Sequence, residues 1–321
     1  MIDIIIPAYN AHNTIYDTIF SLAYQNISKK LNIYIVNDKS TTDYKNFISF
    51  FKKSFNSIKE LKLRTNKGPG YARQYGIEHS KSEYIVFIDS DDVLSSPFVL
   101  KNLYDKIKDE NYDVVISKMK EETNYHSIKH NYLEEYLHGK IYRRKVLSDN
   151  NIKFNNTRLT EDIAFNMSIF LQNVNIGYLD SITYIWKNNR SSLTRKDGNN
   201  FLYISIEDFI YNCLFAIKRA LDGNPNIKKI SEFIYETIIY FYLYYLSFND
   251  KKDFSICFKN MEELINLSEK YEVDYNTKKL IIKNKINEVT SLYNLDIFKL
   301  VNPTISLENF INLIKKEVKN D

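Results

Sequence analysis

An apolar run over residues 84–88 ends in the acidic sequence Asp89-Ser90-Asp91-Asp92. Such a run, bounded by polar clusters, is typical of a strand buried on both faces. Three carboxylates at the end of one strand repel one another unless a cation or a donor-rich ligand holds them. Sites for Mg²⁺-type ions use one or two carboxylates together with substrate phosphates. The spacing therefore predicts a divalent-metal site, and a solvated acidic turn is the alternative.

Other polar residues follow predicted strands earlier in the chain. The strands are expected over residues 2–6, 33–36 and 61–64, and the polar residues after them are Tyr9-Asn10, Asp38 and Asn66-Lys67-Gly68. Amphipathic helix patterns separate these strands, and repeated strand-helix units indicate a mainly parallel sheet with helices on both faces. Ligands of such sheets bind beyond the carboxyl ends of the strands, so we expect these residues to converge with the acidic sequence.

A second pair of acids, Glu161-Asp162, opens a predicted amphipathic helix, and Thr160 is expected to cap it. The amino terminus of a helix favours the ionised form of a nearby carboxyl group, which is the state that a general base needs. The alternative is that both acids only stabilise the first helical turn.

The glycine-rich segment from Gly68 to Arg73 permits a different function. It reads G-x-G-x-x-R, follows a strand, opens a helix and has Asp89 about twenty residues beyond it. A dinucleotide-binding fingerprint has Gly or Ala at the sixth place and normally belongs to the first strand of its sheet. Here the segment follows the third strand, so a dinucleotide-dependent oxidoreductase is the less favoured interpretation.

Composition restricts the class of protein. The 321 residues include 44 basic and 40 acidic side chains, for a net charge of +4. This balance is too even for a dedicated nucleic-acid binder, so no nucleic-acid partner is expected. With 44% hydrophobic residues the chain is globular. The two cysteines, Cys213 and Cys257, lack metal-ligand spacing and fit core positions in a reducing compartment.

The chain shows no targeting or membrane-spanning signal. No cationic segment precedes the first apolar run, so we expect no signal peptide. The most hydrophobic later segment, residues 230–248, contains Glu232, Glu236 and many tyrosines. A spanning helix needs about 20 largely uncharged apolar residues. We expect a cytoplasmic protein without a transmembrane segment, and peripheral association with the inner face of the membrane stays open.

Six segments resemble the motifs of family 2 glycosyltransferases of the GT-A fold, of the bacterial polysaccharide and teichoic-acid type. They read IIIPAYN (4–10), IVNDKSTTD (35–43), NKGPGYAR (66–73), FIDSDD (87–92), HGKIYRR (138–144) and LTED (159–162). Their order and spacing are specific, and the resemblance covers about residues 1–195. One loop departs from the family pattern, because Asn37 replaces an Asp, Lys39 replaces a Gly and one residue is inserted, although Asp38 is retained.

The resemblance implies a nucleotide-sugar donor and residues that bind it. Asp38 is placed to accept a hydrogen bond from N3–H of uracil, and its alternative role is to form the turn. The arginines after residue 186 would grip the diphosphate, since Arg pairs with phosphate through two hydrogen bonds. The full implied set is Pro7, Ala8, Tyr9, Asn10, Asp38, Asn66, Gly68, Arg73, Asp89, Ser90, Arg190, Ser192 and Arg195.

The resemblance also implies a metal site and a catalytic base. Asp91, with Asp89 and His138, would hold Mn²⁺ or Mg²⁺ against the two phosphates, although His138 has a structural alternative. Asp162 is implied as the base, and Glu161 as the residue that orients the base or the acceptor.

The chain is expected to have two parts. We predict a GT-A nucleotide-sugar-binding and catalytic domain, an α/β unit, over residues 1–200 and a helical domain over 201–321. Around the predicted helix at 230–248, aromatic residues spread beyond a single stripe, as in a helix buried on more than one side. The helical domain should therefore pack on the catalytic domain and offer a second surface, for acceptor binding or for a homo-oligomer.

These expectations combine into one predicted function. The protein would move a sugar from a UDP-sugar to a hydroxyl of a glycan or cell-surface polymer precursor, in one metal-dependent displacement with inversion. The alternative of another class is a catalytically silent nucleotide-sugar-binding module that acts through its helical tail. A silent module would need neither Asp89–Asp92 nor Glu161-Asp162, so the presence of both favours the enzyme.

Overall fold

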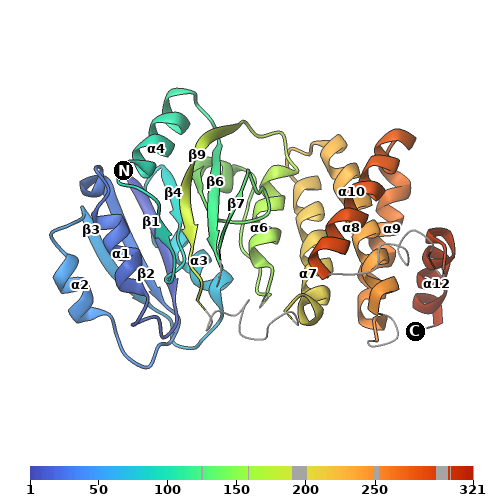
Figure 1. Cartoon of the computed structure of the whole chain (residues 1–321), viewed down its shortest axis with the longest axis horizontal. Helices are drawn as coiled ribbons and strands as arrows, with labels where there is room; N and C mark the ends of the chain where they lie inside the picture. Colours follow the sequence, from blue (N-terminus) through green and yellow to red (C-terminus); the bar gives the residue numbers. More distant parts are fainter. Residues whose placement is uncertain are drawn as a thin grey trace.

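The computed structural model describes residues 1–123, 126–157, 159–189, 201–248, 253–293, 303 and 305–320. An α/β part holds the N-terminus on the left of Figure 1, and a stack of helices continues to the C-terminus on the right. The strands are β1 Ile2–Ala8, β2 Leu31–Asn37, β3 Ser57–Lys62, β4 Tyr84–Phe87, β5 Val93–Leu94, β6 Val114–Glu122, β7 Ser127–His130, β8 Lys140–Arg143 and β9 Ile176–Trp186. The helices are α1 Ile15–Ala23, the short 3₁₀ helix η1 Ser28–Lys30, α2 Lys45–Phe51, α3 Pro69–Glu78, α4 Val99–Asp109, α5 Arg144–Asp149, α6 Glu161–Phe170, α7 Phe201–Leu221, α8 Ile227–Phe248, α9 Ser255–Lys270, α10 Tyr275–Tyr293 and α12 Leu307–Asn320.

The described strands form one sheet in the order β3-β2-β1-β4-β8-β6-β9-β5, with β7 paired to β6. Strands β1 to β4 pair in parallel, as the repeated strand-helix units predicted. Strand β8 lies antiparallel between β4 and β6, and β5 lies antiparallel to β9. The other half of the sheet is therefore mixed. Its short strands β5, β7 and β8 lack the apolar runs by which sequence patterns reveal buried strands.

Side chains of β1 alternate between two hydrophobic cores. Ile2, Ile4 and Ile6 pack with residues of α1, α2 and α4 on one face of the sheet. Ile5 packs on the other face with residues of α3, α5 and α6. All four isoleucines have no exposed surface, which explains why this strand reads as a continuous apolar run.

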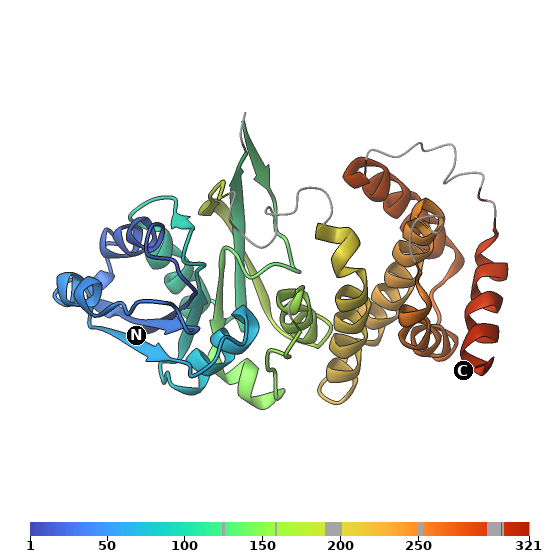
Figure 2. The same cartoon turned by 90° about the horizontal axis from the view of Figure 1, so that it is seen from below.

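Helix α6 belongs to two cores at once. Phe165 and Phe170 pack beneath the sheet. Met167 and Leu171 pack instead in the core of the helical part, which includes Leu214 of α7. Figures 1 and 2 both place α6 directly beside α7. The helix that begins with Glu161-Asp162 therefore packs against both the sheet and the helical part.

The aromatic residues of α8 are used inside the helical part itself. Phe241 and Tyr244 are fully buried, and the rings of Tyr242 and Phe310 of α12 lie 5.3 Å apart between centroids, with their planes tilted by 50°. The predicted second surface rested on aromatic residues of this helix such as Tyr240 and Tyr244, which are buried. Their burial weakens that argument, and homo-oligomer formation stays a prediction. Among the described residues, no helix is both long and apolar enough to cross a membrane.

Candidate active site

The loops after β1, β2 and β3 meet through Asp38. Its two carboxylate oxygens accept hydrogen bonds from the backbone N–H groups of Lys67 and Gly68, both at 2.8 Å. Burial raises the pKa of Asp38, and these two donors oppose the rise. Gly68 has φ of +87°, a conformation that favours glycine, at the residue before α3. The structure thus brings Asp38, Asn66 and Gly68 together. The Asp38 carboxylate holds a distant loop and not its own turn, in which the side chain of Asn37 accepts the Ser40 N–H instead.

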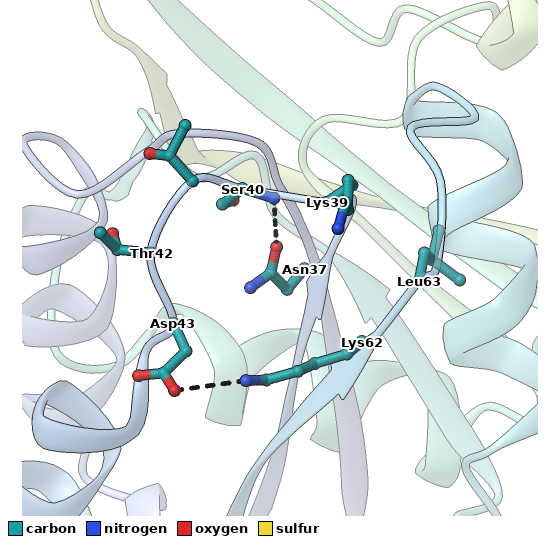
Figure 3. Close-up of a pocket in the computed structure, with 8 residues that line it drawn as sticks. Asn37, Lys39, Ser40, Thr42, Asp43, Lys62 and Leu63 are labelled. Carbon is teal, nitrogen blue, oxygen red and sulfur yellow. Dashed lines mark hydrogen bonds and ion pairs between the residues drawn. The ribbon is translucent and has the colours of Figure 1, made fainter.

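The loop that departs from the family pattern lines, together with Lys62 and Leu63, an open pocket of about 310 Å³. Figure 3 shows Asn37 pointing into the ring formed by this loop, with its Oδ1 accepting the Ser40 backbone N–H at 2.7 Å. Lys39, which replaces the family's glycine, has φ of +65°, so this position keeps the conformation that glycine would adopt. Asn10 joins the loop to the end of β1, because its Oδ1 accepts the Thr41 backbone N–H at 2.9 Å.

Arg73 on α3 connects two acidic segments that lie far apart in the sequence. Its Nη2 donates to Asp89 Oδ1 and its Nη1 to Glu161 Oε1, both at 2.6 Å. The guanidinium is almost fully buried. Gly70 makes this approach possible, because a Cβ there would lie 2.8 Å from Glu161 Cγ. We expected Arg73 to contact the donor, whereas in the structure two carboxylates occupy its guanidinium, so a donor contact stays a prediction.

This ion pair network controls the charge of its members. Burial acts to raise the pKa of Asp89, but the charges of Arg73 and His138 hold it well below its usual range. Burial alone would lower the pKa of Arg73, and the two carboxylates raise it instead. Asp89 and Arg73 are therefore a stably ionised pair, and the network supplies one positive charge for several carboxyl groups.

The end of β4 also holds the candidate metal ligands. Ligand atoms of Asp89, Asp92 and His138 lie within 4.8 Å of one another. Asp92 accepts the Tyr184 hydroxyl at 2.6 Å through Oδ2 and the Lys187 backbone N–H at 2.8 Å through Oδ1. Both oxygens of Asp92 are thus already compensated within the protein, although it is part of the compact group.

Asp91 differs from Asp92 in its surroundings. Asp91 is partly exposed, and its Oδ2 accepts a hydrogen bond from Asn189 Nδ2 at 2.7 Å. Burial and the charge of Asp89 raise the pKa of Asp91, which is the repulsion that a bound cation relieves. His138 turns Nε2 toward this acidic group, 3.4 Å from Asp89 Oδ2 and 3.8 Å from Asp92 Oδ2. Carboxylates under mutual repulsion beside an imidazole nitrogen fit a divalent cation.

Asp162 is the second residue of α6, directly after Glu161. Burial and the neighbouring Glu161 charge raise the pKa of Asp162 to about 7. Desolvation therefore opposes the ionised form that the helix terminus is expected to favour. A pKa near neutrality suits a general base, since efficient bases titrate close to the working pH. Thr160 does not cap the helix through its side chain, and it has the left-handed conformation φ 57°, ψ 21°.

The remaining predicted residues are spread over the same edge or lie outside the described part. At the end of β1, Ala8 is buried while Tyr9 is 56% exposed. Pro7 and Ser90 are partly buried. Three predicted diphosphate contacts lie outside the described residues, namely Arg190, Ser192 and Arg195.

Two further residues support the site and were missed. Buried Lys140 donates hydrogen bonds from Nζ to the backbone oxygens of Leu133, at 2.5 Å, and Tyr136. These bonds hold the segment that leads to His138. Burial lowers the pKa of Lys140 to about 7. Asn212 of α7 has no exposed surface and donates to the Leu159 backbone oxygen at 2.9 Å. Lys140 lies within a segment that resembles the family, which is a usable signal, whereas nothing near Asn212 in the sequence marks it.

Comparison with known proteins identifies relatives. Residues 3–167, more than half of the chain, match the family model described as glycosyl transferase family 2. The chain is 27% identical over 256 residues to a poly(ribitol-phosphate) beta-glucosyltransferase of Bacillus spizizenii, covering 73% of this chain and 39% of that protein. It is 28% identical over 226 residues to the poly(ribitol-phosphate) beta-N-acetylglucosaminyltransferase TarS of Staphylococcus aureus, covering 64% and 38%. The chain therefore spans well under two thirds of these relatives.

Solved structures share the fold. The structure of residues 1–349 of Staphylococcus aureus TarS in complex with UDP-GlcNAc superposes with a TM-score of 0.67, at 21% identity and 91% coverage of both chains. A mannosyltransferase from Pyrobaculum calidifontis, in complex with GDP-Man and Mn²⁺, gives 0.57 at 12% identity, covering 99% of this chain and 84% of that chain. The expected GT-A fold followed by a helical region is confirmed.

Proposed function

We propose that this chain, which belongs to glycosyl transferase family 2, moves a sugar from a UDP-sugar to a hydroxyl of a ribitol-phosphate polymer. That it is a glycosyltransferase follows from its family. The polymer and the UDP-sugar are inferred from the names of the relatives and from the UDP-GlcNAc complex of TarS.

One observation carries the proposal for the catalytic residues. Arg73 joins the end of β4, which carries Asp89, to the start of α6, which carries Glu161 and Asp162. In the linear sequence Asp89 and Asp162 are over seventy residues apart. A donor diphosphate bound near Asp89 and an acceptor bound near Asp162 would thus be held next to each other by one buried guanidinium.

The strand-end loops are proposed to hold the nucleotide. The Lys67 and Gly68 amides fix the Asp38 carboxylate, which would accept the hydrogen bond from N3–H of uracil. Tyr9, at the end of β1, is exposed and would contact the nucleoside. Asn10 and Ser40 keep the neighbouring loop in place, since the Asn10 backbone N–H donates to Ser40 Oγ at 3.0 Å. Loops that are already ordered before binding lose little conformational entropy when the donor arrives.

Asp89, Asp91 and His138 are proposed to hold the divalent cation, Mn²⁺ or Mg²⁺. Asp92 lies closer to Asp89 and His138 in the structure, but we favour Asp91 as the ligand. The Tyr184 hydroxyl and the Lys187 backbone N–H already donate hydrogen bonds to both carboxylate oxygens of Asp92. Bound there, the cation would act as a Lewis acid that neutralises charge on the departing diphosphate.

Asp162 is proposed to take the proton of the acceptor hydroxyl. The acceptor oxygen forms its bond to the anomeric carbon as the bond to the UDP oxygen breaks, and UDP leaves with the electron pair. The proton passes to the Asp162 carboxylate, and attack opposite the leaving group inverts the anomeric configuration. Glu161 cannot share this role easily, because its carboxylate is buried against Arg73.

The experiment measures transfer from UDP-glucose and UDP-GlcNAc to poly(ribitol phosphate), with Mn²⁺ present. We expect UDP release that requires the polymer, and a β-linked product by NMR where the donor is α-linked. Asp162→Asn should abolish transfer while UDP affinity stays within about twofold, since the base does not touch the donor. Asp149→Asn, which changes an exposed acid on α5, is the matched control and should have normal activity. Retained configuration or normal transfer by Asp162→Asn would contradict the mechanism.

A further inference from the structure

Thr160, the residue before the proposed base pair, has a strained backbone. Its φ of 57° and ψ of 21° place it in the left-handed region. This region is uncommon for residues other than glycine and a genuine outlier for a β-branched side chain. Such strain persists only when surrounding contacts hold it, and it clusters at functional sites. The residues that hold Thr160 therefore determine how Glu161 and Asp162 are presented.

Those contacts come from the helical part of the chain. Asn212 Nδ2 on α7 donates to Thr160 Oγ1 at 2.8 Å and to the Leu159 backbone oxygen at 2.9 Å. One turn earlier on α7, Asp208 Oδ2 accepts the Leu159 backbone N–H at 3.2 Å. Both backbone polar groups of Leu159 are thus fixed by α7, although 49 to 53 residues separate the partners.

A second set of contacts holds the start of the same segment. Asn155 Nδ2 donates to Asn212 Oδ1, and Thr157 Oγ1 donates to the same oxygen at 3.2 Å. Asn212 is fully buried, so each of its hydrogen-bonding groups depends on these partners. On the opposite side, a Cβ at Gly70 would lie 3.2 Å from the Asn155 backbone oxygen, so the segment is packed between α3 and α7.

We propose that Asn212 is a positioning residue that holds the strained turn at Thr160 and thereby sets the place of Asp162. The inference rests on the proposed function, in which Asp162 is the base. It gives the helical part a defined role: α7 completes the active site by fixing the segment that leads into α6. A side chain that served only the stability of the helical part would have no reason to contact Leu159 and Thr160.

The test compares four variants in the full chain. Asn212→Ala removes the hydrogen bonds that Asn212 makes with the turn and leaves the Asp208 contact with Leu159 in place. Asn212→Leu removes the same bonds while filling the space. Thr237→Val is the matched control, because buried Thr237 on α8 donates a hydrogen bond at 2.8 Å to Phe233 within its own helix. It also contacts Cys213 of α7, so this variant disturbs α7 beside Asn212 while leaving the Asn212 hydrogen bonds to the turn in place. Asn212→Ala combined with Thr160→Gly tests the strain directly, since glycine adopts the left-handed conformation without help from a side chain.

Kinetics separate positioning from stability. With UDP-GlcNAc and poly(ribitol phosphate), Asn212→Ala or Asn212→Leu should lower kcat about 10- to 100-fold, the effect of a displacement near 1 Å, with KM for UDP-GlcNAc within about twofold. Thr160→Gly in the Asn212→Ala background should restore at least part of kcat. Thr237→Val should lower only the melting temperature. Normal kcat in both Asn212 variants, or no recovery by Thr160→Gly, would overturn the proposal.

A second measurement does not depend on the reaction. Hydrogen exchange of a peptide covering residues 159–165 should become about tenfold faster or more in Asn212→Ala and stay unchanged in Thr237→Val, because exchange reports local opening. Unchanged exchange in Asn212→Ala would overturn the positioning role even with no assay of transfer. If the unmodified protein uses neither UDP-GlcNAc nor UDP-glucose, the proposed function fails while this measurement still decides the role of Asn212.

Discussion

Asp162→Asn should make the protein inactive and, at alkaline pH, more stable. The raised pKa of Asp162 means that the folded state holds its proton more tightly than the unfolded state does. Ionising this group as the pH rises therefore costs folding free energy. An asparagine at the same position stays neutral at every pH and avoids that cost.

The size of the effect follows from the two proton affinities. Folding raises the pKa from 3.8 to about 7, which corresponds to roughly 4 kcal/mol at about 1.4 kcal/mol for each tenfold change in proton affinity. Asp162 is partly exposed, and solvent reduces the cost of its ionisation, so we expect about 2–4 kcal/mol. The contribution of protonated Asp162 is complete below pH 3.8 and is lost between pH 3.8 and pH 7.

Urea denaturation at several pH values measures this difference. From pH 5 to pH 8 the stability of Asp162→Asn relative to the unmodified protein should rise by a large part of 2–4 kcal/mol. The unmodified enzyme should also lose about tenfold in kcat for each pH unit below 7, because only ionised Asp162 accepts a proton. A stability difference that does not change with pH would refute the claim that Asp162 has a raised pKa.

Three other outcomes follow from the structure. Arg73→Met leaves the buried Glu161 carboxylate without its partner, and urea denaturation should show a loss of about 3–5 kcal/mol, whereas a loss below 1 kcal/mol would contradict a buried ion pair. After EDTA treatment, added Mn²⁺ should raise the melting temperature of the unmodified protein but not that of His138→Ala, and an equal rise in both would exclude His138 as a ligand. A chain ending at residue 200 should aggregate in size-exclusion chromatography because α6 loses the core it shares with α7, and a monodisperse folded fragment would disprove this dependence.

Much of the site was predictable because parallel strands end at one edge. Asp38 follows β2 and Asp89 follows β4, on either side of β1, so the sheet alone brings their loops together. The apolar runs that identify these strands are strong because both faces are buried. Glu161-Asp162 could also be placed at a helix start from the pattern of apolar residues, and α6 does begin at Glu161.

The contacts that tune these residues could not be predicted. Arg73 and Glu161 are 88 positions apart, and Thr160 and Asn212 are 52 apart. Local patterns describe which face of an element is apolar, whereas these pairs depend on how elements from distant segments pack. Thr160 illustrates the difference, since its residue type favours a cap, whereas in the structure its hydroxyl accepts a hydrogen bond from Asn212 and its backbone is left-handed.

The two adjacent acids of α6 share one counterion unequally, although burial raises the pKa of both. Arg73 contacts Glu161 and Asp89 directly, and their negative charges are thereby compensated. Asp162 has no such direct contact in the described structure, and the Glu161 charge acts against its ionisation. Asp162 thus has a pKa of about 7 without a direct contact to the guanidinium. In this arrangement Glu161 is an electrostatic neighbour that makes Asp162 a better proton acceptor, and exchanging the two residues would not preserve the chemistry.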